Sequence, residues 1–243
     1  MISGESPVPI FRLHERMDFP PAELAEPEGI LAVGGDLSPE RLLLAYTSGI
    51  FPWYSEGEPI LWWSPDPRFV MFPEELHLPA SLRRLLRRDP FRFTCDREFE
   101  CVIASCAEPR PAQAGTWITG DMQEAYVRLH TLGYAHSVEA WAGEELAGGL
   151  YGVSLGSCFF GESMFSRRSN ASKAALCFLV EALRRHAFTL IDCQVHTAHL
   201  EILGARFIPR TDYLSRLHAG LLRPTMRGNW GELFGKKKKI DML

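Results

Sequence analysis

The sequence lacks any long hydrophobic run and any N-terminal segment typical of secretion. Its most apolar stretch, residues 174–180, is too short to span a membrane, and Glu181 follows it at once. The N-terminal segment contains Glu5 and lacks the apolar core that a signal peptide needs. Six cysteines are present but form no C-x-x-C pair, which argues against a zinc site or a disulfide framework. These absences favour a cytoplasmic protein with reduced thiols and no membrane segment.

Charge is present in ordinary amount but is unevenly distributed. The chain is 46% hydrophobic and 23% charged, which is typical of a globular protein with a real core, and its net charge is −4. Residues 1–60 hold ten acids against three bases, whereas six arginines crowd into residues 83–97. A basic patch on an acidic protein suits a partner met at one place, such as one end of an RNA. The alternative is a solvated helix face.

The N-terminal part is rich in proline and glycine turn signals and contains one well-marked helix. The pattern predicts this helix over residues 40–48, with Ser38 as its N-cap and Gly49 at its end. Two segments that follow, residues 50–54 and 60–63, are too apolar for open loops. We therefore expect both segments to pack against a second domain.

The rest of the chain alternates helical and strand-like patterns, and its middle is the most informative part. An antiparallel meander is followed there by helix, strand, helix and strand, an order found in acyltransferases of the N-acetyltransferase type. This order predicts a fold but not a function. The predicted helices cover residues 79–88, 96–106, 121–132, 172–186 (capped by Asn170 or Ser172) and 197–203, and the predicted strands cover residues 91–94, 136–141, 146–155, 158–165, 189–195 and 206–209.

Three motifs have plain structural explanations. The G-x-S-x-G pattern around Ser154 would need a strand-to-helix elbow, but Ser154 stands between two strand-like runs, so a hairpin turn explains it better. His196 and His199 lack further ligands at metal-binding spacing, which favours helix capping or packing. The lysine run at residues 236–239 is read as a solvated tail, with weak RNA attraction as the alternative.

A missing glycine loop and two isolated acids bear on the chemistry. Residues 166–170 lie where a coenzyme A-dependent enzyme of this fold needs a glycine-rich turn, yet they contain no glycine, so another acyl donor has to be considered. Glu162 and Asp192 stand in apolar strand-like runs, and a buried acid must be paired or hydrogen-bonded. The structural alternative to a functional site is an ion pair with an arginine such as Arg167.

At this point the sequence resembles the family of leucyl/phenylalanyl-tRNA–protein transferases. The matching stretches follow the family's order and span about residues 18–214, which is far more specific than any single motif. They are LAVGGDLSP (31–39), GIFPWY (49–54), LWWSPDPR (61–68), GTWIT (115–119), FGESMFS (160–166), NASK (170–173) and LIDCQV (190–195).

The resemblance implies an α+β protein with a small N-terminal domain, residues 1–66, and an N-acetyltransferase-like catalytic domain, residues 67–243. It implies transfer of Leu, Phe or, less often, Met from aminoacyl-tRNA to proteins that begin with Arg or Lys. The product would be marked for degradation by the bacterial N-end rule pathway. No metal, organic cofactor or membrane is expected, and we expect a monomer.

The implied reaction needs placement more than it needs a strong base. The donor is an activated ester, and an α-amine with a pKa of about 7.7–8.0 is partly neutral at cytoplasmic pH. We hypothesise that Asp192 and Gln194, two apart on one strand and facing one cleft, position this amine. In this hypothesis Gln194 acts through its amide oxygen and Asp192 orients Gln194. Glu162, on a neighbouring strand, would hold the acceptor's Arg or Lys side chain.

The tRNA end has three candidate contacts. Trp53 and Trp117 are predicted to stack on the terminal adenine, with core packing as the alternative. The family commonly has an aromatic residue where this chain has Leu179, so the sequence does not rank Leu against Phe. The donor side chain would enter a pocket of Leu150, Met164, Leu176, Leu179 and Ile191, and the acceptor-stem phosphates would bind Arg83, Arg84, Arg87 and Arg88.

Two other functions are compatible with parts of the sequence. A coenzyme A-dependent N-acyltransferase would share the fold, but the loop without glycine counts against it. A non-catalytic RNA-binding module would explain the basic helix and the tryptophans, yet it leaves the two acids and Gln194 unexplained.

Overall fold

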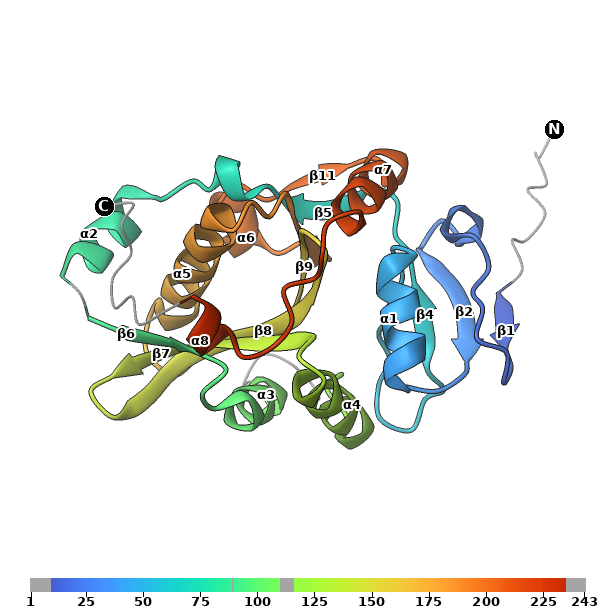
Figure 1. The fold of residues 1–243 in the computed structure, drawn as a ribbon, viewed down its shortest axis with the longest axis horizontal. Coiled ribbons are helices and arrows are strands. Elements are labelled where there is room, and N and C mark those ends of the chain that lie inside the picture. Colours follow the sequence, from blue (N-terminus) through green and yellow to red (C-terminus); the bar gives the residue numbers. More distant parts are fainter. Residues whose placement is uncertain (1–9, 89, 110–115, 235–243) are drawn as a thin grey trace.

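The computed structural model describes residues 10–88, 90–109 and 116–234, and it contains two β-sheets (Figure 1). The smaller sheet has the order β1-β2-β4-β3, and the larger has the order β11-β5-β10-β9-β8-β7-β6. The lysine run lies outside the described residues, and so do Gly115 of the GTWIT motif and part of the preceding loop. The strands of the smaller sheet are β1 (Phe11–Leu13), β2 (Ile30–Gly34), β3 (Phe51–Pro52) and β4 (Leu61–Trp63).

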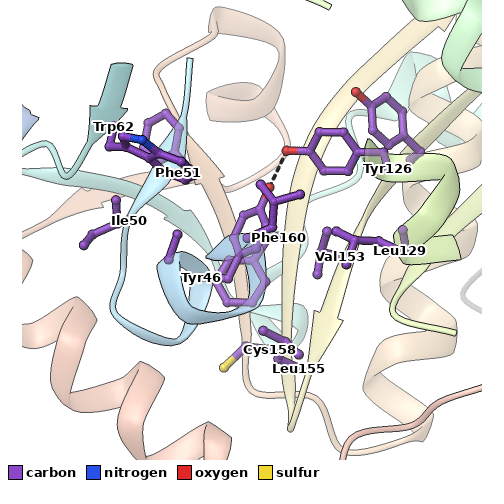
Figure 2. Close-up of a cluster of buried hydrophobic side chains, with 14 of the residues drawn as sticks. Tyr46, Ile50, Phe51, Trp62, Tyr126, Leu129, Val153, Leu155, Cys158 and Phe160 are labelled. Atoms are coloured by element: carbon purple, nitrogen blue, oxygen red, sulfur yellow. Dashed lines mark hydrogen bonds between the residues drawn. The ribbon is translucent and has the colours of Figure 1, made fainter. Parts of the chain in front are cut away.

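The predicted N-terminal helix is confirmed as α1 (Pro39–Thr47). The Ser38 side chain accepts a hydrogen bond from the Arg41 backbone N–H, and Gly49 follows with a left-handed φ of 73°. The short helix η1 (Ala22–Leu24) precedes it. Because α1 faces the larger sheet, its buried Tyr46 reaches that sheet's core (Figure 2).

The larger sheet is mostly antiparallel, with one parallel pair, β9 and β10, at its centre. Helix α5 (Ala171–Arg185) covers one face of this sheet, and α3 (Phe99–Ala107) and α4 (Gly120–Thr131) cover the other (Figure 1). The predicted α+β class and N-acetyltransferase-like arrangement are therefore confirmed. The strands are β5 (Arg68–Met71), β6 (Arg92–Cys95), β7 (Ala135–Ala142), β8 (Glu145–Leu155), β9 (Cys158–Ser166), β10 (Leu190–Gln194) and β11 (Arg206–Ile208).

Side chains alternate between the two faces of this sheet and divide the core into two clusters. Tyr151 and Phe160 belong to the cluster on the α3 and α4 face, which also takes in the apolar N-terminal segments around Phe51 and Trp62. Leu150 and Phe159 belong to the cluster beneath α5. The prediction that the N-terminal segments pack against the rest of the chain is confirmed, because they share one core with it (Figure 2). The domain division after residue 66 stays a prediction.

Several local details differ from the predictions. Helix α3 begins three residues later than expected, because Asp96 has a left-handed φ of 54° that no α-helix accommodates. Asn170 stands at the N-cap position of α5 with a φ of 64°, but its side chain makes no capping hydrogen bond, so the predicted side-chain cap is wrong. The elements η2 (Pro73–Glu75), α7 (Arg210–Leu221) and α8 (Trp230–Leu233) were not predicted, whereas α2 (Ala80–Arg87) and α6 (Ala198–Ile202) were. None of the six cysteines, all of which lie in the described residues, forms a disulfide.

Candidate active site

A cavity of about 310 Å³ opens where the two central strands separate. The parallel pairing of β9 with β10 ends at the pair Phe160 and Asp192. Beyond that pair each strand continues, and the cavity is lined by Glu162 from β9 and by Cys193 and Gln194 from β10. The split in the sheet therefore gives the cavity access to side chains from both faces.

The side of the cavity beneath α5 is apolar. All five residues predicted for the donor pocket line the cavity, so the structure brings them together: Leu150, Met164, Leu176, Leu179 and Ile191. Phe159 and Leu200 extend the same surface. Burial of a leucine-sized side chain against such a surface is worth about 1.5–3 kcal/mol, which suits an apolar substrate group.

Glu162 is the centre of the polar side. Tyr46 and Tyr126 donate hydrogen bonds to its two carboxylate oxygens, each at 2.8 Å, and Gln194 Nε2 donates at 2.9 Å. The hydroxyl oxygens of the two tyrosines also lie 2.5 Å apart (Figure 2). Burial raises the pKa of Glu162 to about 7, although the three hydrogen bonds act in the opposite direction. The carboxylate can therefore change charge near neutral pH.

Asp192 lies behind the cavity rather than in it. Its carboxylate is fully buried and accepts two hydrogen bonds from Arg68, at 2.8 and 2.7 Å, and one from the Tyr213 hydroxyl at 2.8 Å. The guanidinium lies 4.6 Å from the ring centres of both Phe51 and Tyr213. Burial lowers the pKa of Arg68, but the charge of Asp192 outweighs this and raises it above its usual value.

The ion pair with an arginine suggested from the sequence exists for Asp192, but its partner is Arg68 and not Arg167. Arg167 instead pairs with Glu108 at 2.6 Å on the surface and donates to Ser105 at 3.0 Å. Because Arg68 lies in a separate motif 124 residues before Asp192, their proximity depends on the β10–β5 pairing.

Gln194 sits at a break in the β10 ladder. Its φ is 62°, and the register with β5 shifts between Asp192 and Gln194. The carboxylate of Asp192 accepts the backbone N–H of Gln194 at 3.0 Å, which fixes this unusual conformation. We expected both side chains in one cleft; only Gln194 lines the cavity, and Asp192 supports it from behind.

Trp53 and the four arginines are exposed, whereas Trp117 is partly buried. Trp53 and Trp117 both line the cavity, and Trp53 is 39% exposed, so packing in the core does not account for it. Trp117 is partly buried against the core. On α2, Leu82 and Leu86 are buried, and the opposite side carries the exposed arginines at 83, 84, 87 and 88.

Among the remaining motif residues, His199 lines the cavity, whereas Ser154 and His196 do not. Ser154 lies inside β8, fully buried, without the elbow that a serine nucleophile needs. His196 pairs with Glu201 at 2.9 Å, whereas His199 contacts the Met164 sulfur at 3.2 Å. Among the described residues, no group of three or more His, Cys, Asp or Glu is placed to hold a metal ion.

Sequence reasoning missed four residues of the network. They are Tyr46, Arg68, Tyr126 and Tyr213, which hold the two carboxylates. Arg68 stood inside a quoted motif, and its place just after a proline-rich turn was the one signal available. The tyrosines lie on apolar helix faces, where a single sequence does not distinguish a ligand from a core residue.

A split sheet with an apolar cavity on one face and a hydrogen-bonded carboxylate on the other, in an N-acetyltransferase-like fold, defines an acyltransferase. Residues 70–218 match the family described as leucyl/phenylalanyl-tRNA protein transferase, and residues 35–66 match its N-terminal domain. The chain belongs to this family. It is therefore an enzyme that transfers leucyl or phenylalanyl groups from tRNA to protein.

Close relatives support the same assignment. The chain is 63% identical over 224 residues to the leucyl/phenylalanyl-tRNA–protein transferase of Syntrophus aciditrophicus (strain SB), covering 92% of this chain and 94% of that protein. It is 62% identical over 222 residues to the enzyme of Anaeromyxobacter sp. (strain Fw109-5), covering 91% and 94%. A solved structure, L-PGS from Bacillus licheniformis, has a TM-score of 0.39 at 12% identity over 69% of this chain and 54% of that one, a likeness too partial to carry an argument. No helix in the described ranges is long and apolar enough to cross a membrane.

Proposed function

We propose that this enzyme transfers Leu, Phe or Met to proteins whose first residue is Arg or Lys. The observation that carries the proposal is the two-sided cavity. An apolar surface beneath α5 suits the donor side chain, and Glu162 with Gln194 on the other side suits a cationic acceptor. The direct test mixes the protein with radiolabelled Leu-tRNA and a peptide beginning with Arg, with a peptide beginning with Ala as control. Equal labelling of the two peptides would refute the acceptor specificity.

In this proposal the reaction is aminolysis of the tRNA ester in the split between β9 and β10. The acceptor nitrogen attacks the ester carbonyl carbon, a C–N bond forms, and the bond from that carbon to the 3′ oxygen breaks. The amine loses one proton, and the 3′ oxygen gains one. Gln194 would orient the amine through its amide oxygen, because its Nε2 already donates to Glu162. Asp192 would act indirectly, because it accepts the backbone N–H of Gln194 and so positions that residue.

The roles of the tRNA contacts remain proposals supported by exposure. Trp53, which is exposed, and Trp117, which is partly buried, both line the cavity, which suits stacking on a terminal adenine. The four exposed arginines of α2 suit acceptor-stem phosphates. We further propose that the enzyme acts as a monomer in the cytoplasm, needs no metal or organic cofactor, and marks its products for N-end rule degradation.

A coenzyme A thioester is the alternative donor for this fold. The loop from Ser166 to Asn170 contains no glycine, and Asn170 takes the left-handed conformation at the start of α5. Ser166 accepts the Ser172 backbone N–H at 3.4 Å, so this early amide of the helix already has a partner. Titration with coenzyme A, monitored by protein melting temperature, should give no shift; a saturable shift would favour the alternative.

A further inference from the structure

Tyr151 is a cavity residue that the proposed reaction does not yet use. It stands on β8, fully buried, on the same face of the sheet as Glu162. Its ring packs edge-on against Tyr126, with centres 5.5 Å apart, and against Phe99 at 5.9 Å. Tyr46 and Tyr126 donate to Glu162, whereas the Tyr151 hydroxyl has no hydrogen-bond partner.

An unpartnered buried hydroxyl is unusual and calls for an explanation. Within the described part of the chain, four buried side-chain polar atoms lack a hydrogen-bond partner. One of them is the hydroxyl of Tyr151, a residue that is fully buried and also lines the cavity. Leaving such a group unsatisfied costs about 1–3 kcal/mol, so a partner supplied by a bound molecule would recover free energy. Burial and the nearby charge of Glu162 raise the pKa of Tyr151 well above its usual value, so the hydroxyl keeps its proton.

The charge of the cavity indicates which substrate group fits there. The formally charged residues among its described lining residues are two acids, Glu108 and Glu162. Arg167 pairs with Glu108 at 2.6 Å, so the charge that favours a cation is that of Glu162 in its ionised form. The donor side chain is assigned to the opposite face, beneath α5, so the group that reaches Tyr151 comes from the acceptor. Arginine and lysine heads only donate hydrogen bonds, and a tyrosine oxygen can accept one.

We propose that the Tyr151 hydroxyl accepts a hydrogen bond from the cationic head of the acceptor's first residue and so helps to select Arg and Lys. This inference rests on the proposed function and adds a second polar contact beside Glu162. The arrangement explains acceptance of both cations, because a single hydroxyl oxygen does not require the planar fork of a guanidinium.

The test compares Tyr151→Phe with Ser154→Ala. Ser154 lies on the same strand and also has a buried hydroxyl without a partner, but it does not line the cavity. Initial rates are measured at saturating Leu-tRNA over a range of concentrations of peptides that begin with Arg, Lys or norleucine. Tyr151→Phe should lower kcat/KM about 10- to 100-fold for the Arg and Lys peptides, the range for a hydrogen bond to a charged group, and less than twofold for norleucine. Ser154→Ala should change none of the three.

Two further readouts separate selection from structure. The melting temperature of Tyr151→Phe should equal or exceed that of the parent, because the lost hydroxyl had no protein partner. The affinity for Leu-tRNA should not change. The inference is overturned by an equal loss on all three peptides, by weakened Leu-tRNA binding, or by no kinetic effect. A parent enzyme that does not prefer Arg and Lys over norleucine would instead refute the proposed acceptor specificity itself.

Discussion

Replacement of Asp192 by Asn should destabilise this protein severely, although the two side chains have the same shape. Both oxygens of Asp192 are occupied by donors: Oδ1 by Arg68 Nε and the Gln194 N–H, and Oδ2 by Arg68 Nη2 and the Tyr213 hydroxyl. An asparagine must place its NH₂ group against one of these donor pairs. Neither orientation of the amide satisfies the site, and Arg68 is left as an uncompensated buried charge.

The magnitude follows from burial. The side chains of the ion pair are 1% and 0% exposed, so water does not compensate either charge. Removal of one partner from a buried pair costs about 3–5 kcal/mol. The free energy of unfolding of a folded domain is only about 5–15 kcal/mol, so the substitution should remove a large part of it. A surface pair gives the contrast: Arg168 with Glu145, each more than half exposed, should contribute no more than about 1 kcal/mol.

Urea unfolding measures both effects. Asp192→Asn and Arg68→Met should each lower the free energy of unfolding by about 3 kcal/mol or more. The double variant should lose less than the sum of the two, because no unpaired charge then remains buried. Glu145→Gln is the matched control and should change little. A loss below about 1 kcal/mol for Asp192→Asn, or strict additivity in the double variant, would refute this reasoning.

Other predictions concern activity. Gln194→Ala should lower the single-turnover rate much more than Leu-tRNA affinity, and a near-normal rate would exclude a positioning role for this amide. Neutralising the four arginines of α2 to Gln should weaken tRNA binding and flatten its salt dependence by close to one unit per lost phosphate contact, without changing amino-acid preference. Leu179→Phe should shrink the donor pocket and change the Leu-to-Phe ratio by about 10-fold or more, measured as the ratio of kcat/KM values. Because burial raises the pKa of Glu162 to about 7, its carboxyl is protonated below that pH, so the KM for an Arg peptide should rise as pH falls from 8 to 6. The peptide's α-amine is also protonated over this range, so the rise in Glu162→Gln should be smaller than in the parent enzyme, and an equal rise in the two would contradict the assignment.

Most helices and strands of the larger sheet could be predicted, because their signals are local. The meander β7–β8–β9 has alternating apolar residues and glycine turns, and α2 has leucines at helical spacing. Strand β5 gave no such signal: its four residues are all buried, so no alternation exists, and it follows a proline-rich segment. The N-cap residue of α7, Pro209, offers no side-chain cap. The helix begins instead with the buried Arg210, whose backbone N–H donates to the distant Asp66 carboxylate and whose guanidinium bonds the backbone carbonyls of Ser64 and Glu23. The start of this helix therefore depends on residues far away in the sequence, and the local sequence does not predict it.

The candidate site was predictable where its chemistry followed the strand pattern and not where it depended on packing across the molecule. The apolar donor pocket follows from alternation along β8, β9 and β10 and from one face of α5. The tyrosines around Glu162 come from α1 and α4, which meet only in the folded chain. A buried carboxylate predicts that partners exist, but it does not say which residues they are.

The backbone of Gln194 connects the buried ion pair to the cavity. A non-glycine residue with φ of 62° is strained by about 1 kcal/mol or more, and glycine would relieve that strain. Glycine, however, would remove the amide that bonds Glu162 at the cavity. The chain instead keeps the amide and holds the strained backbone from behind, through the N–H that Asp192 accepts. Arg68 and Tyr213 in turn hold Asp192 in place through hydrogen bonds. The buried ion pair of Arg68 and Asp192 therefore helps to position the Gln194 side chain at the point where β9 and β10 separate.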